Sequence, residues 1–169
     1  MKKLICNIGS IALGVLASIM AFIPMFDVMG KTSKETMWAE VPFGIFSTPS
    51  NIVTEMFNLG NNGYKGIFKI IAMILVIVAI IAVALIVIGF IVELLGNKKS
   101  IFATLKKFAS LALIVIAVLI AIATIIFMVS NKFGEDGMTI SIAVRNWFAY
   151  LSVIIGFAGS GLLAMFAKK

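Results

Sequence analysis

The stretch IFKIIAMILVIVAIIAVALIVIGFIVELL, residues 67–95, decides the fold. From Ile70 to Phe90 it is wholly aliphatic apart from its Gly, Met and Phe residues. A helix of about 20 apolar residues crosses a hydrocarbon core about 30 Å thick. A barrel strand would alternate in polarity and need only about 10 residues. The stretch therefore predicts a transmembrane helix.

The rest of the chain has the same character. Of its 169 residues, 62% are hydrophobic and 12% are charged, whereas soluble domains have roughly 45–50% apolar and about 25% charged residues. We therefore predict an α-helical integral membrane protein, a four-helix transmembrane bundle that forms a single membrane domain over residues 1–169. The predicted transmembrane helices are residues 4–26, 67–95, 108–129 and 147–167. Two outer loops, residues 27–66 and 130–146, and one inner loop, residues 96–107, would connect them.

The lysines predict the orientation. One side of the predicted spans has Glu93 as its single acidic residue, and its basic residues are Lys2, Lys3, Lys98, Lys99, Lys106, Lys107, Lys168 and Lys169. On the other side, basic and acidic residues balance. The positive-inside rule then places both termini and the inner loop in the cytoplasm. We expect a multi-pass plasma-membrane protein, and abundant Lys and Ile with scarce Arg favour a bacterial source.

The residue types argue against an enzyme. Histidine is absent and Cys6 is the single cysteine, so the chain offers no intrachain disulfide and no Cys/His metal site. Ion carriers and proton relays place charged residues deep in their spans, and the deep parts of the predicted helices contain none. Glu93 falls near a helix end, where snorkelling to the headgroups explains it. We predict no catalytic residue, metal or cofactor, and no nucleic-acid partner.

Small residues recur every fourth position in the first and last predicted helices. They are Ser10, Gly14 and Ser18, then Gly156, Ser160 and Ala164. This spacing puts them on one face of a helix, where small side chains let two helices approach closely. We predict helix-packing seams that either close the bundle or join copies of the chain, and we favour the first role.

The outer loops contain strand and helix signals. The sequence MWAEVPFGIFS, residues 37–47, predicts a short, bent strand, which Pro42 limits to an edge or a bulge. Residues 47–60 predict a short helix, and alternation over residues 138–144 predicts one more strand. Because isolated strands are marginal in water, we expect these pieces to pair into one small extracellular β-sheet.

This arrangement resembles the claudin and peripheral-myelin-protein superfamily. That family has four spans, and its first outer loop carries a tryptophan followed by a Gly-Leu-Trp signature. Here Trp38 is followed by Gly44, Ile45 and Phe46. The family's two disulfide-bonded cysteines have no counterpart in this loop. The resemblance implies an outer sheet that apolar packing alone would hold.

The sequence leads to one preferred function and two alternatives. We expect a non-enzymatic, claudin-like membrane protein whose extracellular loops mediate contacts or assembly with copies of itself or with another membrane protein. Aromatic residues are enriched at interface hot spots, so the predicted contact residues are Trp38, Phe43, Ile45 and Phe46. One alternative is an oligomeric pore, lined by Asn7, Ser10, Ser18 or the region of Thr124. The other is an accessory subunit of a larger membrane complex.

Overall fold

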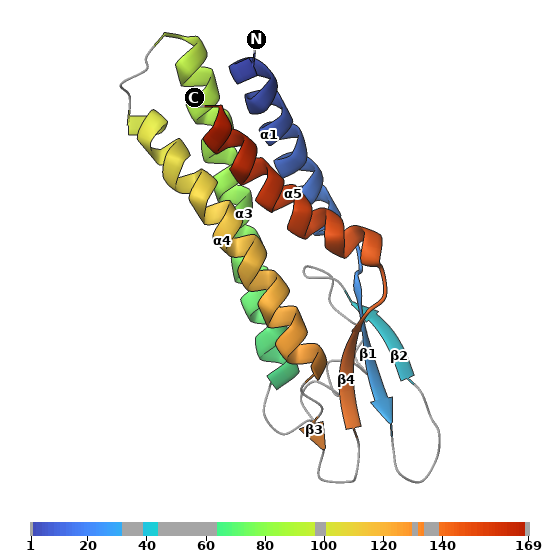
Figure 1. Cartoon of the computed structure of the whole chain (residues 1–169). Helices are drawn as coiled ribbons and strands as arrows, with labels where there is room; N and C mark the ends of the chain where they lie inside the picture. Colours follow the sequence, from blue (N-terminus) through green and yellow to red (C-terminus); the bar gives the residue numbers. More distant parts are fainter. Residues whose placement is uncertain are drawn as a thin grey trace.

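The computed structural model describes residues 2–31, 39–43, 64–96, 101–129, 132–133 and 139–167. Four helices run side by side (Figure 1): α1 (Lys2–Met20), α3 (Tyr64–Leu94), α4 (Ile101–Val129) and α5 (Trp147–Phe166). Each is long and apolar enough to cross a membrane. The protein is therefore a membrane-spanning helical bundle. Both termini lie at one end of the bundle, the termini end, and short strands lie at the other, the sheet end.

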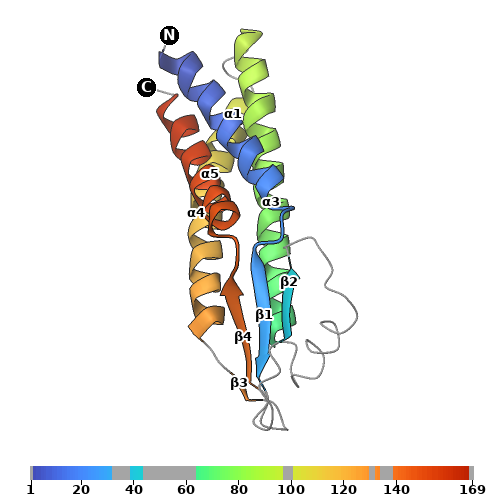
Figure 2. The same ribbon diagram turned by 90° about the vertical axis from the view of Figure 1, so that its right-hand side faces the viewer.

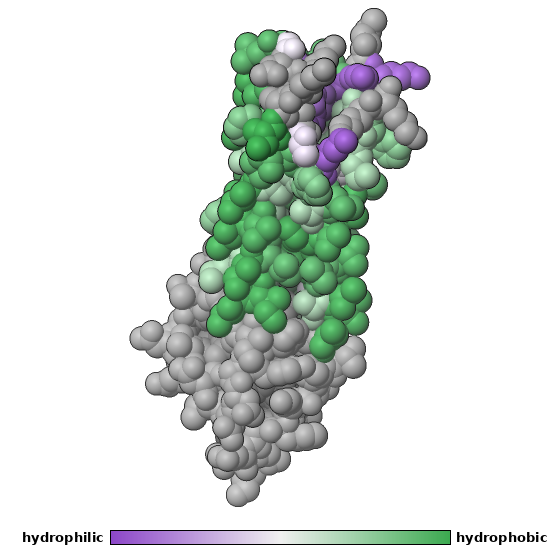
Figure 3. Space-filling view, turned by 90° about the vertical axis from the view of Figure 1, so that its left-hand side faces the viewer, coloured by the Kyte–Doolittle hydropathy of each residue, from purple (hydrophilic) through white to green (hydrophobic). Residues whose placement is uncertain are grey.

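Within the described residues, the helices pack in the order α1, α5, α4, α3, and α1 touches α3 less extensively than α5. Most of the fully buried side chains are small or branched, such as Ala17, Val76, Leu113 and Val153, and the largest include Phe157. Leucine, isoleucine and valine also cover the outward faces, which matches a lipid environment. Figure 3 shows hydrophilic residues gathered at the termini end, above a broad hydrophobic belt.

The helix bounds differ from the prediction by more than three residues at two places. Helix α1 ends at Met20 rather than at residue 26, because Pro24 disfavours helical backbone in the residue before it. Helix α4 begins at Ile101 rather than at residue 108. Lys106 and Lys107 therefore belong to a helix and not to the predicted inner loop 96–107.

Within the described part of the chain, four strands form one antiparallel sheet in the order β2-β1-β4-β3 (Figure 2). They are β1 (Phe26–Lys31), β2 (Ala39–Phe43), β3 (Lys132–Phe133) and β4 (Thr139–Val144). Strand β1 pairs on one side with β2, with Phe26 opposite Phe43, and on the other with β4, with Phe26 opposite Val144. Both connecting segments between helices at this end thus contribute to the same sheet.

The segments of β2 and β4 were predicted as strands, whereas those of β1 and β3 were not. Among the described strands, β2 is at an edge of the sheet, which suits Pro42 because proline has no N–H to donate to a ladder. The predicted helix over residues 47–60 lies outside the described residues.

Candidate functional site

The small residues of the predicted packing seams meet across α1 and α5. The Ser10 hydroxyl donates to the Ser160 carbonyl oxygen at 2.7 Å, and the two hydroxyl oxygens are 3.3 Å apart. A Cβ atom added to Gly156 would lie 2.7 Å from the Ala17 Cβ and 3.0 Å from the Leu13 carbonyl oxygen. In this structure the seam therefore lies inside one chain and closes the bundle.

The remaining seam residues take different positions. A Cβ added to Gly14 would lie 2.9 Å from the Ser160 hydroxyl oxygen and 2.8 Å from a methyl group of Val83, so Gly14 lies where α1 meets both α5 and α3. Ala164 is buried. Ser18 is only partly buried, and its hydroxyl donates to the Gly14 carbonyl oxygen of its own helix at 2.8 Å.

We expect Ser10→Ala to lower the free energy of unfolding by about 0.6 kcal/mol, the typical value of a hydrogen bond between membrane helices. The matched control is Ser18→Ala, which removes a bond within one helical turn and should leave the stability nearly unchanged. Unfolding by SDS in mixed micelles measures both. Equal losses in the two variants would contradict an interhelical role for Ser10.

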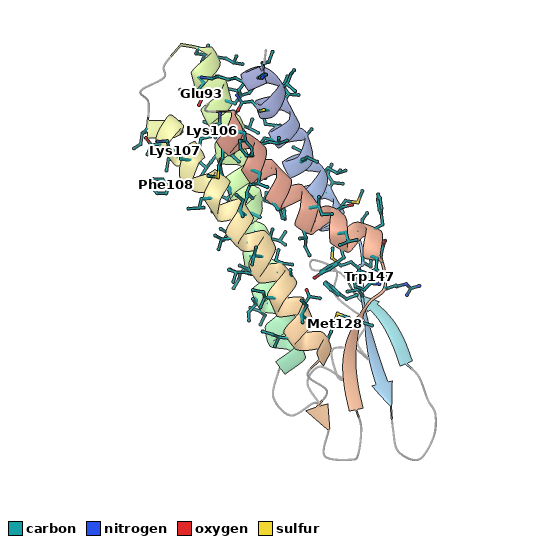
Figure 4. The ribbon with its side chains drawn as sticks, in the orientation of Figure 1. Glu93, Lys106, Lys107, Phe108, Met128 and Trp147 are labelled. Carbon is teal, nitrogen blue, oxygen red and sulfur yellow. The ribbon has the colours of Figure 1, made fainter. Side chains whose placement is uncertain are left out.

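An ionic cluster joins three helices near the termini end. Lys106 of α4 donates from its Nζ to the Oδ1 of Asn7 in α1 at 2.8 Å and to the Oε2 of Glu93 in α3 at 2.9 Å. The same ammonium lies 5.9 Å from the centroid of the Phe90 ring. Figure 4 shows Glu93 and Lys106 at this end of the bundle. We call Asn7, Glu93 and Lys106 the ionic cluster.

The charge of Lys106 is inside the protein. Its side chain is 4% exposed and that of Glu93 is 29% exposed, and Lys106 falls within the apolar span Thr104–Ile126. A buried charge is tolerated when an opposite charge and hydrogen bonds compensate for lost hydration. The ammonium group of a lysine has three N–H donors. In Lys106 two of them donate to the oxygens of Asn7 and Glu93, and the Phe90 ring lies nearby. The ionic cluster can therefore hold α1, α3 and α4 together.

Gly89 makes room for the lysine. A Cβ added there would lie 2.9 Å from the Cβ of Lys106 and 3.1 Å from the carbonyl oxygen of Phe102. Any side chain at this position would push α3 away from α4. The absence of a side chain lets the stem of Lys106 pass between the two helices toward Glu93.

The inner loop predicted for Lys106 is wrong, because Lys106 belongs to α4. Glu93 lies near the end of α3, as predicted, and it forms an ion pair with Lys106 that the sequence analysis did not predict. The sequence did contain a signal. Lys106 extends the buried stripe of Ser110, Leu113 and Ala117 with helical spacing, whereas Lys107 falls off the stripe and is exposed.

At the other end of the bundle, backbone and aromatic contacts attach the sheet to the helices. The Met25 carbonyl oxygen accepts from the backbone N–H groups of Arg145 at 3.0 Å and Asn146 at 3.3 Å. Asn146 also caps α5, since its Oδ1 accepts from the Ala149 N–H at 3.0 Å. The Phe26 ring meets the Tyr150 ring edge to face, with centroids 5.9 Å apart. We call Met25, Phe26, Asn146 and Tyr150 the junction.

One of the four predicted contact residues, Phe43, lies within the described residues. Trp38, Ile45 and Phe46 lie outside the described residues, and Phe43 is placed by its backbone at the end of β2. Among the described residues, no three His, Cys, Asp or Glu side chains come together as a metal site requires.

Comparison with protein-family models, with curated proteins and with solved structures gives no match.

Proposed function

We propose that the protein is a non-enzymatic, claudin-like membrane protein that mediates protein contacts or assembly through the segments of its sheet end. The observation that carries the proposal is the junction. It connects β1, which follows α1, to β4 and α5 through two backbone hydrogen bonds and a ring contact, so that the sheet is attached directly to the bundle. A sheet held in this way suits a surface that binds another protein, because little ordering entropy is lost on binding.

Charge supports the orientation that this function needs. The described side chains at the termini end include the exposed Lys2, Lys3 and Lys107. Under the positive-inside rule this end faces the cytoplasm, and the sheet end faces outward. The sheet is then extracellular, and the loops that it supports are available to neighbours.

The pore alternative receives less support from the described residues. Of the four positions considered for a lining, Asn7, Ser10 and Thr124 are buried in the bundle. Their side chains are hydrogen-bonded to Lys106, Ser160 and the Ile120 carbonyl, respectively. A pore between copies of the chain would not reach them.

The double variant Trp38→Ser, Phe46→Ser tests the proposal. We expect it to insert and fold like the wild type but to lose most of the assembled species in native mass spectrometry of gently extracted protein. The reason is that hot-spot aromatics typically contribute 2 kcal/mol or more each to binding.

The matched control changes aromatic residues on the bundle, away from the junction contacts. Phe148→Ser, Phe166→Ser removes two exposed rings of α5 and should leave assembly unchanged. Assembly that survives the first double variant, with folding intact in both, would refute the role of the loop aromatics.

A further inference from the structure

A pocket of about 310 Å³ opens between α4 and α5 near the termini end. Its walls are mostly apolar and include Phe108 and Leu111 of α4 and Ala164 and Met165 of α5. Phe108, Leu111 and Met165 are each about half exposed or more, so the pocket opens on the face of the bundle that would meet lipid.

The helix contact beside the pocket explains its location. A side chain at Gly161 of α5 would collide with the carbonyl oxygen of Ser110 in α4, so the two backbones are close at that level. One turn further along α5, at Ala164 and Met165, the lining of the pocket begins. The pocket therefore occupies space beside a tight backbone contact, and filling it needs no movement of the helices.

The charges at the pocket are of one sign. Both lysines of α4 line it, but Lys106 is turned inward and paired with Glu93. Lys107 is exposed, and within the described part of the chain no carboxylate forms an ion pair with it. The hydroxyl of Ser110, the other polar side chain of the lining, donates to the Lys106 carbonyl oxygen of its own helix at 2.6 Å. Lys107 is therefore the cation of this pocket that remains for a ligand.

We propose that this pocket binds one anionic phospholipid, with an acyl chain against Phe108, Leu111 and Met165 and the phosphate headgroup at Lys107. The pocket and the lipid match in two ways. The apolar pocket is open to the bilayer and fits an acyl chain, and Lys107, at the edge of the apolar span, attracts the negative charge of the headgroup. A zwitterionic lipid fits the pocket equally well. It binds less strongly to Lys107, because its headgroup has no net charge. The inference holds whichever side of the membrane the termini end faces.

The test is lipid retention after reconstitution into bilayers of equal amounts of phosphatidylglycerol and phosphatidylcholine with identical acyl chains. Native mass spectrometry of the mildly extracted protein then counts each lipid that stays bound. The wild type should retain phosphatidylglycerol preferentially. Lys107→Gln should lower that preference about fivefold, the effect of one lysine near a charged headgroup. Lys3→Gln, an exposed lysine of α1 outside the pocket, is the control and should leave the preference unchanged.

A second pair of variants tests whether the apolar part of the pocket binds the acyl chain. Leu111→Trp should fill the pocket and lower the retention of both lipids, whereas Leu119→Trp, at an equally lipid-facing position of α4 outside the pocket, should not. Equal retention of the two lipids by the wild type would overturn the proposal. Equal losses in Lys107→Gln and Lys3→Gln would also overturn it, since they would indicate diffuse surface charge rather than a site.

Discussion

Replacing Glu93 by Leu is expected to lower the free energy of unfolding by about 3–5 kcal/mol, the cost of leaving one member of a buried ion pair without its partner. Lys106 is buried, and after the change the Asn7 oxygen, 2.8 Å away, and the Phe90 ring, 5.9 Å away, would be the described groups left beside its charge. The lysine would have to leave the bundle interior, and α3 would lose its polar link to α4.

Replacement of the whole ionic cluster should lower the free energy of unfolding far less than Glu93→Leu does. Asn7→Leu, Glu93→Leu and Lys106→Met together substitute apolar groups of similar volume, and buried ion pairs replaced in this way are often neutral or stabilising. We expect the triple variant to lie within about 1–2 kcal/mol of the wild type in SDS unfolding, and to be clearly more stable than Glu93→Leu.

The neighbouring lysine provides the control. Lys107→Met removes an exposed charge of the same helix and should change the stability by no more than about 0.5 kcal/mol, as is usual for surface positions. If Glu93→Leu lowered the free energy of unfolding as little as Lys107→Met, then Glu93 would not stabilise the buried charge of Lys106. The proposal that the ionic cluster holds the three helices together would be refuted.

The sequence predicted the membrane-spanning helices well, because hydropathy alone is enough to identify them. The segment 67–95 coincides closely with α3, since an apolar run of that length has no other stable place than a bilayer. The start of α4 was missed for a related reason. Hydropathy detects the part of a helix that lies in lipid, whereas lysine is itself a good helix former and lets α4 begin at Ile101.

The parts that sequence reasoning missed depend on partners distant in the chain. Strand β1 has the sequence FDVMGK, which contains a glycine and no clear alternation, and it becomes a strand because β2 and β4 pair with it on both sides. The ion pair of Lys106 with Glu93 was missed because its two residues were assigned to a loop and to a helix end. Their meeting depends on how α3 and α4 align.

Replacing Gly156 by Ala is expected to destabilise the bundle by about 1–3 kcal/mol, the usual cost of adding a methyl group to a filled interior. The new Cβ would lie 2.7 Å from the Ala17 Cβ and 3.0 Å from the Leu13 carbonyl oxygen. Neither neighbour can rotate away, because one is attached directly to the backbone and the other belongs to it. Helices α1 and α5 would have to separate, which would also lengthen the Ser10 to Ser160 hydrogen bond.

Gly159 of the same helix is the matched control. It also faces α1, but the atom nearest to it belongs to a side chain that can rotate. A Cβ there would lie 2.9 Å from the terminal methyl of Leu13, which a rotation of that side chain can move. Gly159→Ala should therefore be nearly neutral in SDS unfolding, helped by the higher helix propensity of alanine. Similar costs at the two glycines would mean that overall crowding of the α1–α5 interface, and not the backbone contact at Gly156, limits how closely these helices pack.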